Sequence, residues 1–395
     1  MRIIVITNLY PPQELGGYGR CISDFVWGLL RNGHEIYVLT SNAPYLAPAS
    51  NIGPNNEFVS RDLILKGSFE KGCYIETNAS VISSVDKHNS LVLNELCCSG
   101  WDGCLLGNID LLGISLVDIL SKHNIPVLHH IGFIDPPYSP SEFPSHTRYS
   151  MAAASHSVRN SLLHHGFPPE STLVIYPGVR DDIFKSSTSV PSSAIRHSLS
   201  LHEAGHPIGS PSNPLRIGFA GLIMASKGLH TLIQAAIELR SSGVSVIINI
   251  AGSSFQNDYN EYLLKIISSQ SLENDFFFYG QLSRKSLTRF WSLQHIGVFP
   301  SIHPEAFGIS AAEIMCSGLL LCSTGVGGAS EMFTHGQTGL MFKADNAQSL
   351  FQSICSVIGN VSLLSRISTN AHDQISRQFS VTSSVALIED YFLAP

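Results

Sequence analysis

Two glutamates eight residues apart are the side chains best placed to do chemistry. Glu305 and Glu313 lie in the run Ser-Ile-His-Pro-Glu-Ala-Phe-Gly-Ile-Ser-Ala-Ala-Glu, which spans residues 301–313. A helix predicted to begin at Gly308 would offer unpaired backbone N–H groups and a positive dipole end, which together bind anions. The carboxylates would instead accept hydrogen bonds from hydroxyls. An anion between two hydroxyl-binding carboxylates describes a nucleotide-sugar, although two surface glutamates on an ordinary helix explain the pair alone equally well.

A second candidate site lies in the run Phe-Ala-Gly-Leu-Ile-Met-Ala-Ser-Lys-Gly over residues 219–228. A strand, a turn at Gly221 and a helix start at Lys227-Gly228 would bring a cation and backbone donors to a diphosphate. A plain strand–turn–helix with a solvated lysine is the better explanation of this segment alone. Its combination with Glu305 and Glu313 favours ligand binding.

Strands alternate with helices along the chain, which predicts an α/β protein with doubly wound parallel sheets. In the first half the predicted elements are strand Arg2–Thr7, helix Gly19–Asn32 and strands Glu35–Leu39, Ser90–Leu93, Gly103–Leu106 and Pro126–His129. In the second half they are strand Arg216–Ala220, helix Leu229–Arg240, strands Ser245–Ala251, Phe276–Tyr279 and Ile296–Pro300, helix Gly308–Cys316 and strand Leu319–Ser323.

Ser, Pro and Gly dominate between the two halves, as in an exposed linker. We therefore predict a first Rossmann-like domain over 1–185, a linker or insertion over 186–214 with a weak helix near Ala194–His202, and a second Rossmann-like domain over 215–378. Ligands bind beyond the carboxyl ends of such strands, so the cleft between the two domains is the predicted site.

Composition excludes several classes of function. The chain has 395 residues, 13% charged residues and a net charge of −7, which gives no electrostatic footprint for nucleic acid. Peripheral membrane contact is left open but has no support, and no apolar run is long enough to span a bilayer. The eight cysteines include no Cys-x-x-Cys, so neither a metal site nor a disulfide framework is expected. A cytoplasmic protein without a cofactor is the prediction.

Several segments, in the expected order along nearly the whole chain, resemble the retaining glycosyltransferases of family 4. These segments are Tyr10-Pro11-Pro12 with Gly16-Gly17, residues 154–179, Pro304-Glu305-Ala306-Phe307-Gly308 with Glu313 (a Glu-x7-Glu motif), and Gly325-Val326-Gly327-Gly328. The resemblance implies the GT-B fold, in which two Rossmann-like domains face a central cleft. It also implies a last helix, about 379–395, that crosses back to the first domain.

The resemblance also implies roles for individual residues in a metal-independent transfer of a hexose-type sugar from a nucleotide-diphosphate sugar. Glu305, Lys227 and a histidine of the pair His129-His130 would serve catalysis, and His130 is preferred because it is nearer the following loop. The donor would be bound by Gly16, Gly17, Leu282, Phe307, Gly308, Ile309 and Glu313. Within this set Glu313 would hold the ribose and the segment around Leu282 the base.

One position departs from the family pattern. The family usually has an arginine directly after Gly221, and this chain has Leu222. Lys227 and the helix start would then carry more of the diphosphate charge. The alternatives are a non-catalytic nucleotide-sugar-binding relative, for which Leu222 is the only support, and another enzyme on the same plan, such as a nucleotide-sugar epimerase or a phosphorylase. The acceptor, whether sugar, lipid-linked or small molecule, cannot be identified from the sequence.

Overall fold

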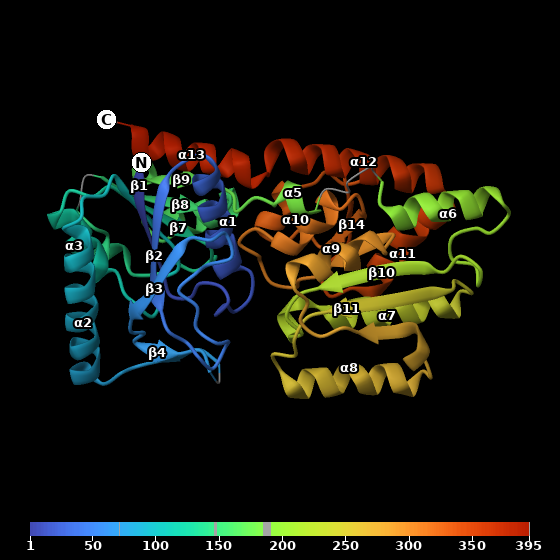
Figure 1. Ribbon diagram of the computed structural model, residues 1–395. Helices are drawn as coiled ribbons and strands as arrows, with labels where there is room; N and C mark the ends of the chain where they lie inside the picture. The colour runs from blue at the N-terminus through green and yellow to red at the C-terminus, as the bar shows by residue number, and fades with distance from the viewer. Residues whose placement is uncertain (71, 146–147, 185–190, 395) are drawn as a thin grey trace. The chain divides into compact units, whose positions relative to one another are not determined.

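The computed structural model describes residues 1–70, 72–145, 148–184 and 191–394, which form two compact units (Figure 1). The first unit contains residues 1–178 together with 381–394, and the second contains the described residues of 179–380. The predicted domain limits differ from these by a few residues at 185 and 379 and by more at the linker.

Seven parallel strands form the sheet of the first unit, in the order β3-β2-β1-β6-β7-β8-β9. The central strand β1 carries four consecutive side chains, Ile3 to Ile6, that are fully buried. Such a continuous apolar run is typical of a parallel strand covered on both faces. The strands are β1 (Arg2–Thr7), β2 (Glu35–Ser41), β3 (Phe58–Leu63), β6 (Gly103–Leu106), β7 (Val127–Ile131), β8 (Tyr149–Ala153) and β9 (Thr172–Val174), with a separate antiparallel pair β4 (Gly67–Ser68) and β5 (Tyr74–Ile75).

The C-terminal helix α13 (Val381–Leu393) belongs to the first unit. This agrees with the expected last helix that crosses back to the first domain. It packs against α1 (Tyr18–Arg31), where Gly28 permits the contact because a Cβ there would lie 2.5 Å from Cγ2 of Val385. The buried face of α1 repeats at helical spacing through Ile22, Phe25 and Leu29. The other helices of this unit are α2 (Ala79–Cys97), α3 (Ser115–Lys122) and α4 (His156–His164).

The predicted strand Ser90–Leu93 is wrong, because these residues lie in the middle of α2. The Asn78 side chain caps the start of this helix, and Asn89 and Leu93 lie four residues apart on its buried face. The Asn89 carboxamide also accepts from the N–H and donates to the carbonyl of Ile64, each at 2.9 Å. The short apolar run thus belongs to the buried face of a helix. Apolar content alone does not distinguish such a run from a strand.

The second unit has a six-stranded parallel sheet in the order β12-β11-β10-β13-β14-β15. Its strands are β10 (Leu215–Ala220), β11 (Val246–Ala251), β12 (Phe276–Phe278), β13 (Ile296–Phe299), β14 (Leu320–Ser323) and β15 (Leu340–Met341). Its helices are α5 (Asp181–Phe184), α6 (Ser193–Glu203), α7 (Leu229–Ser241), α8 (Asn257–Ser269), α9 (Arg284–Ser292), α10 (Ile309–Cys316), α11 (Ala347–Ile358) and α12 (Val361–Gln378).

Strand order reverses once in each sheet, between β1 and β6 in the first unit and between β10 and β13 in the second. Adjacent loops at such a reversal leave the sheet in opposite directions, so their starts open a crevice at the carboxyl edge. Each unit by itself is therefore Rossmann-like, as the sequence predicted.

The segment 186–214, predicted as a linker or insertion, is in its described part a folded piece of the second unit and not an exposed linker, and its predicted helix near Ala194–His202 is confirmed as α6. Residues 186–190 lie outside the described residues, but residues 191–214 are folded into the second unit. Ile195 and Ile208 are buried in its core. Ser198 Oγ lies 2.7 Å from Oδ1 of Asn213 and 2.8 Å from Nε2 of His295. The abundance of serine and proline therefore reflects a capped helix, α6, and a turn against the sheet.

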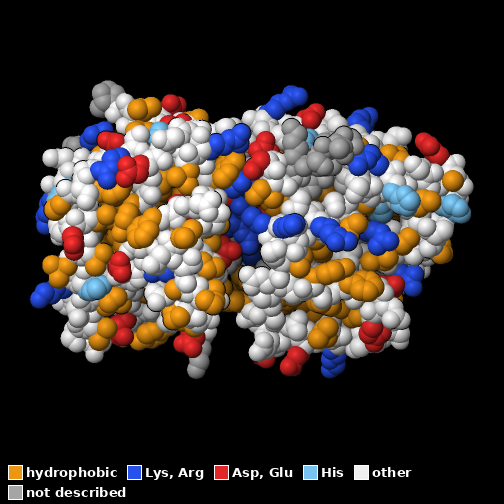
Figure 2. Space-filling view, in the orientation of Figure 1, with side chains coloured by type: hydrophobic (Ala, Val, Ile, Leu, Met, Phe, Trp, Pro, Cys, Tyr) orange, Lys and Arg blue, Asp and Glu red, His pale blue; other side chains and the backbone are white. Residues whose placement is uncertain are grey.

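The surface of the first unit carries no large field of one sign on the face that Figure 2 shows. Acidic and basic side chains are interspersed there with apolar ones, in keeping with the modest net charge of −7. Among the described residues no single helix is long and apolar enough to cross a membrane, although α11 and α12, bent by 107°, reach that length and composition together.

His295 gives the second unit a pH-dependent stability. Burial lowers its pKa from 6.5 to about 4, and Nδ1 accepts from the Arg216 N–H at 2.9 Å. In the unfolded chain His295 therefore binds a proton below about pH 6.5. In the folded unit the same ring stays neutral until about pH 4. Stability attributable to His295 is then complete above pH 6.5 and falls as the pH decreases toward 4.

We expect the free energy of unfolding to fall by roughly 1–2 kcal/mol more between pH 6.5 and pH 5 in the wild type than in a His295→Gln variant. Urea unfolding at both pH values measures this difference. The matched control His202→Gln, at an exposed position of α6, should keep the wild-type pH dependence. An equal pH dependence in wild type and His295→Gln would contradict this role.

Candidate active site

The strand reversal of the second unit brings together two of the predicted site residues. Lys227 lies in the short helical turn Ala225–Lys227 after β10, and Glu305 lies in the loop after β13. The two loops meet through a backbone bond of 2.8 Å from the Ile302 N–H to the Ser226 carbonyl. Gly228 makes this approach possible, because a Cβ there would lie 2.0 Å from the Pro300 oxygen.

Lys227 and Glu305 form a charge-assisted hydrogen bond, with Nζ 2.5 Å from Oε1. Their side chains are 28% and 19% exposed, so the pair is reachable but partly shielded from water. Ser301 donates to the same Oε1 at 2.6 Å. Among the described residues no partner is recorded for Glu305 Oε2. One carboxylate oxygen is therefore fixed within the protein, and the other is available to a ligand.

The backbone of Glu305 is fixed by the glycine-rich segment that follows β14. The Glu305 N–H donates to the Val326 carbonyl at 3.3 Å, and the Gly328 N–H donates to the Glu305 carbonyl at 2.7 Å. Gly327 has φ 69°, and a Cβ there would lie 2.3 Å from the Glu305 oxygen. Only glycine permits this close approach. Gly327 thus holds the Glu305 backbone in one place.

Helix α10 presents an open N-terminus directly after Glu305. Gly308, with φ 98°, caps it without a side chain. Within the described part of the chain the N–H groups of Ile309 and Ser310 have no recorded acceptor, whereas those of Ala311 and Ala312 bond to the Gly308 carbonyl. The open amides can bind an anion.

Phe307 lies just before α10 and Glu313 within it, and both side chains are buried. The Phe307 side chain is 2% exposed and packs near Phe379, with ring centroids 6.1 Å apart, so only its backbone is suited to a ligand. Glu313 lies on the second turn of α10 and is 2% exposed. A buried carboxylate at this position is chemically distinct from the surface glutamate of the alternative interpretation.

The expectation of free backbone donors at the start of α7 is wrong. The His230 N–H donates to the Tyr259 hydroxyl at 3.0 Å, and the Leu229 N–H also contributes to that oxygen. Burial raises the pKa of Tyr259 to about 12, so the phenol stays neutral and caps the helix from α8. His230 Nε2 lies 2.8 Å from Oδ1 of Asp345, which holds the ring. Lys227 therefore contributes its charge without help from this helix end.

Leu282 lies in the loop between β12 and α9, partly buried. Gly280, the second residue of this loop, has a carbonyl that accepts from the Gly252 N–H at 2.8 Å. This places the predicted base-binding segment at the same carboxyl edge of the sheet. Leu222, the departure from the family pattern, is partly exposed just beyond β10.

In the first unit, Gly16 and Gly17 precede α1, and only Gly16 has a positive φ, at 68°. A Cβ at Gly16 would meet no atom within 4 Å, so the loop is open there. The preceding part of the loop is anchored by Tyr10, whose hydroxyl bonds to the buried Glu57 carboxylate. Burial, with the Glu57 charge, raises the pKa of Tyr10 well above its usual value.

The histidine pair at the end of β7 is buried, each side chain being 1% exposed. Nε2 of His130 lies 3.0 Å from the Ile175 carbonyl, and its ring meets Phe25 edge-on. Nδ1 of His129 lies 2.7 Å from the Tyr149 hydroxyl. Burial lowers the pKa of His129 to about 3 and that of His130 to about 4, so both rings are neutral near pH 7. The two rings point to opposite faces, as adjacent strand residues must.

Sequence reasoning missed Ser301 and Tyr259 as parts of the site. Ser301 is the first polar residue after the end of β13 and lies four residues before Glu305, a spacing that could have indicated it. Tyr259 gave no such signal, because its role depends on how α8 packs against α7. Among the described residues no group of three or more His, Cys, Asp or Glu could hold a metal ion.

Comparison with known proteins identifies the second unit. Residues 205–374 match the family model described as glycosyl transferases group 1. An uncharacterized glycosyltransferase of Methanocaldococcus jannaschii is 24% identical over 96% of this chain and 95% of its own length. A glycogen synthase of Mycobacterium tuberculosis is 21% identical over 100% of this chain and 95% of its own length.

Similarity to solved structures extends over the whole chain. The structure of HepE from Anabaena in complex with UDP and glucose aligns with a TM-score of 0.74 at 20% identity, covering 100% of both chains. At this identity the alignment shows the fold, which is the GT-B fold. Residues 205–374 thus resemble a glycosyl transferase group 1 domain, which indicates a transferase enzyme, and the chain has the GT-B fold.

Proposed function

We propose that this protein is a retaining, metal-independent glycosyltransferase of family 4 that moves a sugar from a nucleotide-diphosphate sugar to an acceptor. The observation that carries the proposal is the Lys227–Glu305 contact beside the open amides of α10. It combines a cation, a free carboxylate oxygen and an anion site at one sheet edge. HepE structures hold UDP, glucose or UDP-glucose, which supports a nucleotide-sugar donor and makes UDP-glucose the first donor to test.

In this mechanism the diphosphate binds between Lys227 and the start of α10. An ammonium group has three donors, so Lys227 can keep its bond to Glu305 and still donate to diphosphate oxygens. The backbone N–H groups of Phe307, Gly308 and Ile309 add fixed partial positive charge. Charge that develops on the leaving diphosphate is then stabilised by groups already in place.

The sugar and nucleoside are held by the remaining groups. Glu305 Oε2 accepts from sugar hydroxyls, Glu313 from the ribose, and the backbone around Leu282 contacts the base. Gly16 and Gly17 allow the first loop to approach the donor. We assign His130 to positioning rather than to contact, because its Nε2 already bonds to the Ile175 carbonyl.

Measuring what happens to the nucleotide-sugar distinguishes two other functions from this one. A non-catalytic relative would bind the nucleotide and consume no donor. An epimerase would convert the nucleotide-sugar without releasing the nucleoside diphosphate. A thermal-shift panel of nucleotides and nucleotide-sugars, followed by assay of diphosphate release, distinguishes all three.

We expect Glu313→Ala to weaken nucleoside diphosphate binding by roughly 1–3 kcal/mol, because a buried charge-assisted hydrogen bond to the ribose is lost. Calorimetric titration measures the change. Glu273→Ala, at an exposed glutamate of the same unit, is the matched control and should bind as the wild type does. Unchanged affinity in a folded Glu313→Ala protein would rule out the ribose role.

Lys227→Ala should lower donor turnover on the order of 10²-fold or more, because one preorganised stabiliser of developing charge is removed. Its unfolding midpoint should change little, since the ion pair is partly exposed. Steady-state release of nucleoside diphosphate measures the effect, with Lys265→Ala on the exposed face of α8 as control. Turnover within twofold of wild type would mean that the diphosphate binds elsewhere.

The proposed charge neutralisation by Lys227 and α10 also predicts the response to chelators. Activity should change little in excess EDTA, and the product should keep the anomeric configuration of the donor sugar. Diphosphate release with and without EDTA, together with NMR of the fresh product, tests both points. Loss of transfer in EDTA that manganese or magnesium restores would refute metal independence.

A further inference from the structure

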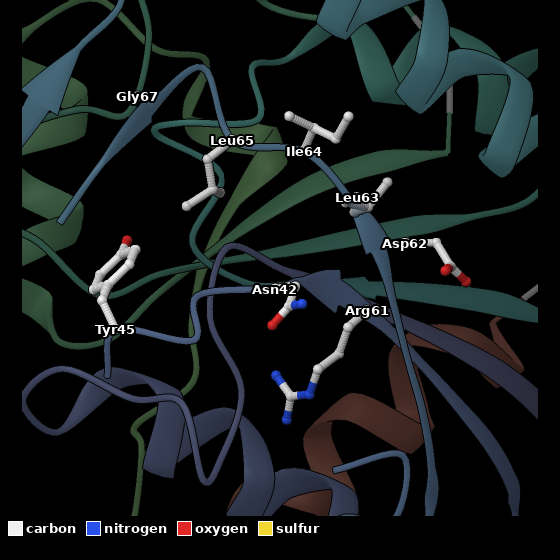
Figure 3. A pocket seen from close by; sticks show the side chains of 8 residues that line it. All are labelled: Asn42, Tyr45, Arg61, Asp62, Leu63, Ile64, Leu65 and Gly67. Carbon is white, nitrogen blue, oxygen red and sulfur yellow. The ribbon is translucent and has the colours of Figure 1, made fainter. Parts of the chain in front are cut away.

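A pocket of about 280 Å³ lies at the carboxyl ends of β2 and β3 in the first unit (Figure 3). Residues just after β2, Asn42 and Tyr45, form one part of its wall, and the β3 end with the following chain, residues 61–65 and Gly67, forms the rest. In the view of Figure 3 the Asn42 amide lies between the Tyr45 ring and Arg61. The carboxyl edge of a doubly wound sheet is where such folds bind ligands.

Among the described residues that line this pocket the one cation is Arg61, and it already bonds within the protein. Arg61 Nε donates to the Ser50 carbonyl at 3.0 Å, and Nη2 donates to the Tyr10 and Pro11 carbonyls at 3.1 and 2.8 Å. Nη1 donates to Gln13 Oε1 at 3.1 Å. Each guanidinium nitrogen thus serves the loop structure of the unit. An anionic ligand would find no free cation among the described residues of the wall, which also include the anionic Asp62.

Neutral hydrogen-bonding groups are, in contrast, available. Gln13 Nε2 donates to Asn42 Oδ1 at 3.0 Å, which fixes the carboxamide. For Asn42 Nδ2 no partner is recorded among the described residues, so it can donate to a ligand oxygen. The Tyr45 hydroxyl accepts from the Phe69 N–H at 3.0 Å, which fixes the ring and leaves the hydroxyl proton for a ligand.

The remaining wall is apolar and aromatic. The Tyr45 side chain is 39% exposed and Ile64 is 45% exposed, so an aromatic ring and an aliphatic chain face solvent beside the polar groups. The Ile64 backbone is clamped by Asn89. A few fixed polar groups set among apolar and aromatic surface are typical of a small-molecule site. A pyranose presents this same combination of hydroxyl edges and C–H faces.

We propose that this pocket binds a neutral saccharide unit of the acceptor. The inference rests on the proposed function, because only a glycosyltransferase needs such an acceptor. Tyr45 provides the face on which the ring lies, and Asn42 donates to its hydroxyls. Because Arg61 is engaged and Asp62 is anionic, the pocket discriminates against phosphorylated sugars.

Saturation-transfer NMR of the full chain, with UDP present to occupy the donor site, tests the proposal. The probes are the methyl glycosides of glucose, galactose, mannose and N-acetylglucosamine, together with glucose 6-phosphate. We expect at least one neutral glycoside to bind and glucose 6-phosphate to bind more weakly. Tyr45→Ala and Asn42→Ala should each raise the Kd of that glycoside, Tyr45→Ala by about tenfold or more.

Two matched variants control for the substitutions themselves. Tyr262→Ala removes an exposed tyrosine of the other unit, and Asn51→Ala an exposed asparagine outside the pocket wall, so both should bind the glycoside as the wild type does. Absence of binding by every neutral glycoside, stronger binding of glucose 6-phosphate, or wild-type binding by Tyr45→Ala and Asn42→Ala would overturn the proposal.

The thermal shift given by UDP is a separate readout. It should be equal in all four variants and the wild type, because none of the substituted residues belongs to the proposed donor site. A missing UDP shift in every protein would count against the UDP donor, whereas a normal shift with no saccharide binding would count against this pocket alone.

Discussion

Close backbone contact at the carboxyl edge of the second sheet is the constraint on which the candidate site depends. The loop after β10 touches the loop after β13 at Gly228, and the loop after β14 touches Glu305 at Gly327. Side chains at either position would force the loops apart. With the loops in contact, Lys227 reaches Glu305, and α10 begins directly beside them. The ion pair is thus a consequence of glycine positions.

The Lys227–Glu305 pair is better suited to binding a ligand than to stabilising the fold. A partly exposed ion pair contributes little to stability, because water screens it and ordering two long side chains costs entropy. Ser301 keeps the carboxylate in place independently of the lysine. The charge of Lys227 therefore remains usable by a ligand, while Glu305 keeps one oxygen free.

The two units share a doubly wound topology, but the side chains at the carboxyl edges of their sheets differ in chemistry. In the second unit the loops at the strand reversal carry a cation and open amides, which suit an anionic diphosphate. In the first unit the comparable edge has a cation, Arg61, but all its nitrogens bond within the protein, and its pKa is lowered by burial. The hydrogen-bonding groups still available among the described residues there, on Asn42 and Tyr45, are neutral, and the remaining charged group, Asp62, is anionic. Under the proposals made above, the second unit would favour the anionic donor, and the first unit would favour a neutral unit of the acceptor.

The sequence by itself determined the alternating elements and both Rossmann-like sheets, because hydrophobic periodicity and glycine placement are local signals. The return of the C-terminal helix followed from the resemblance to a known family, and the roles of the candidate site residues stay predictions. The sequence predicted a strand at residues 90–93, which lie in a helix, and it did not determine that residues 191–214, whose helix near Ala194–His202 it did predict, pack into the second unit. Tertiary structure alone decided which donors and acceptors remain free. Tyr259 closes the start of α7, Ser301 takes one oxygen of Glu305, and Ile175 takes Nε2 of His130. These pairings join residues that are distant in the sequence or depend on the conformation of a local loop. Which hydrogen-bonding groups are already paired is therefore decided only when the chain has folded.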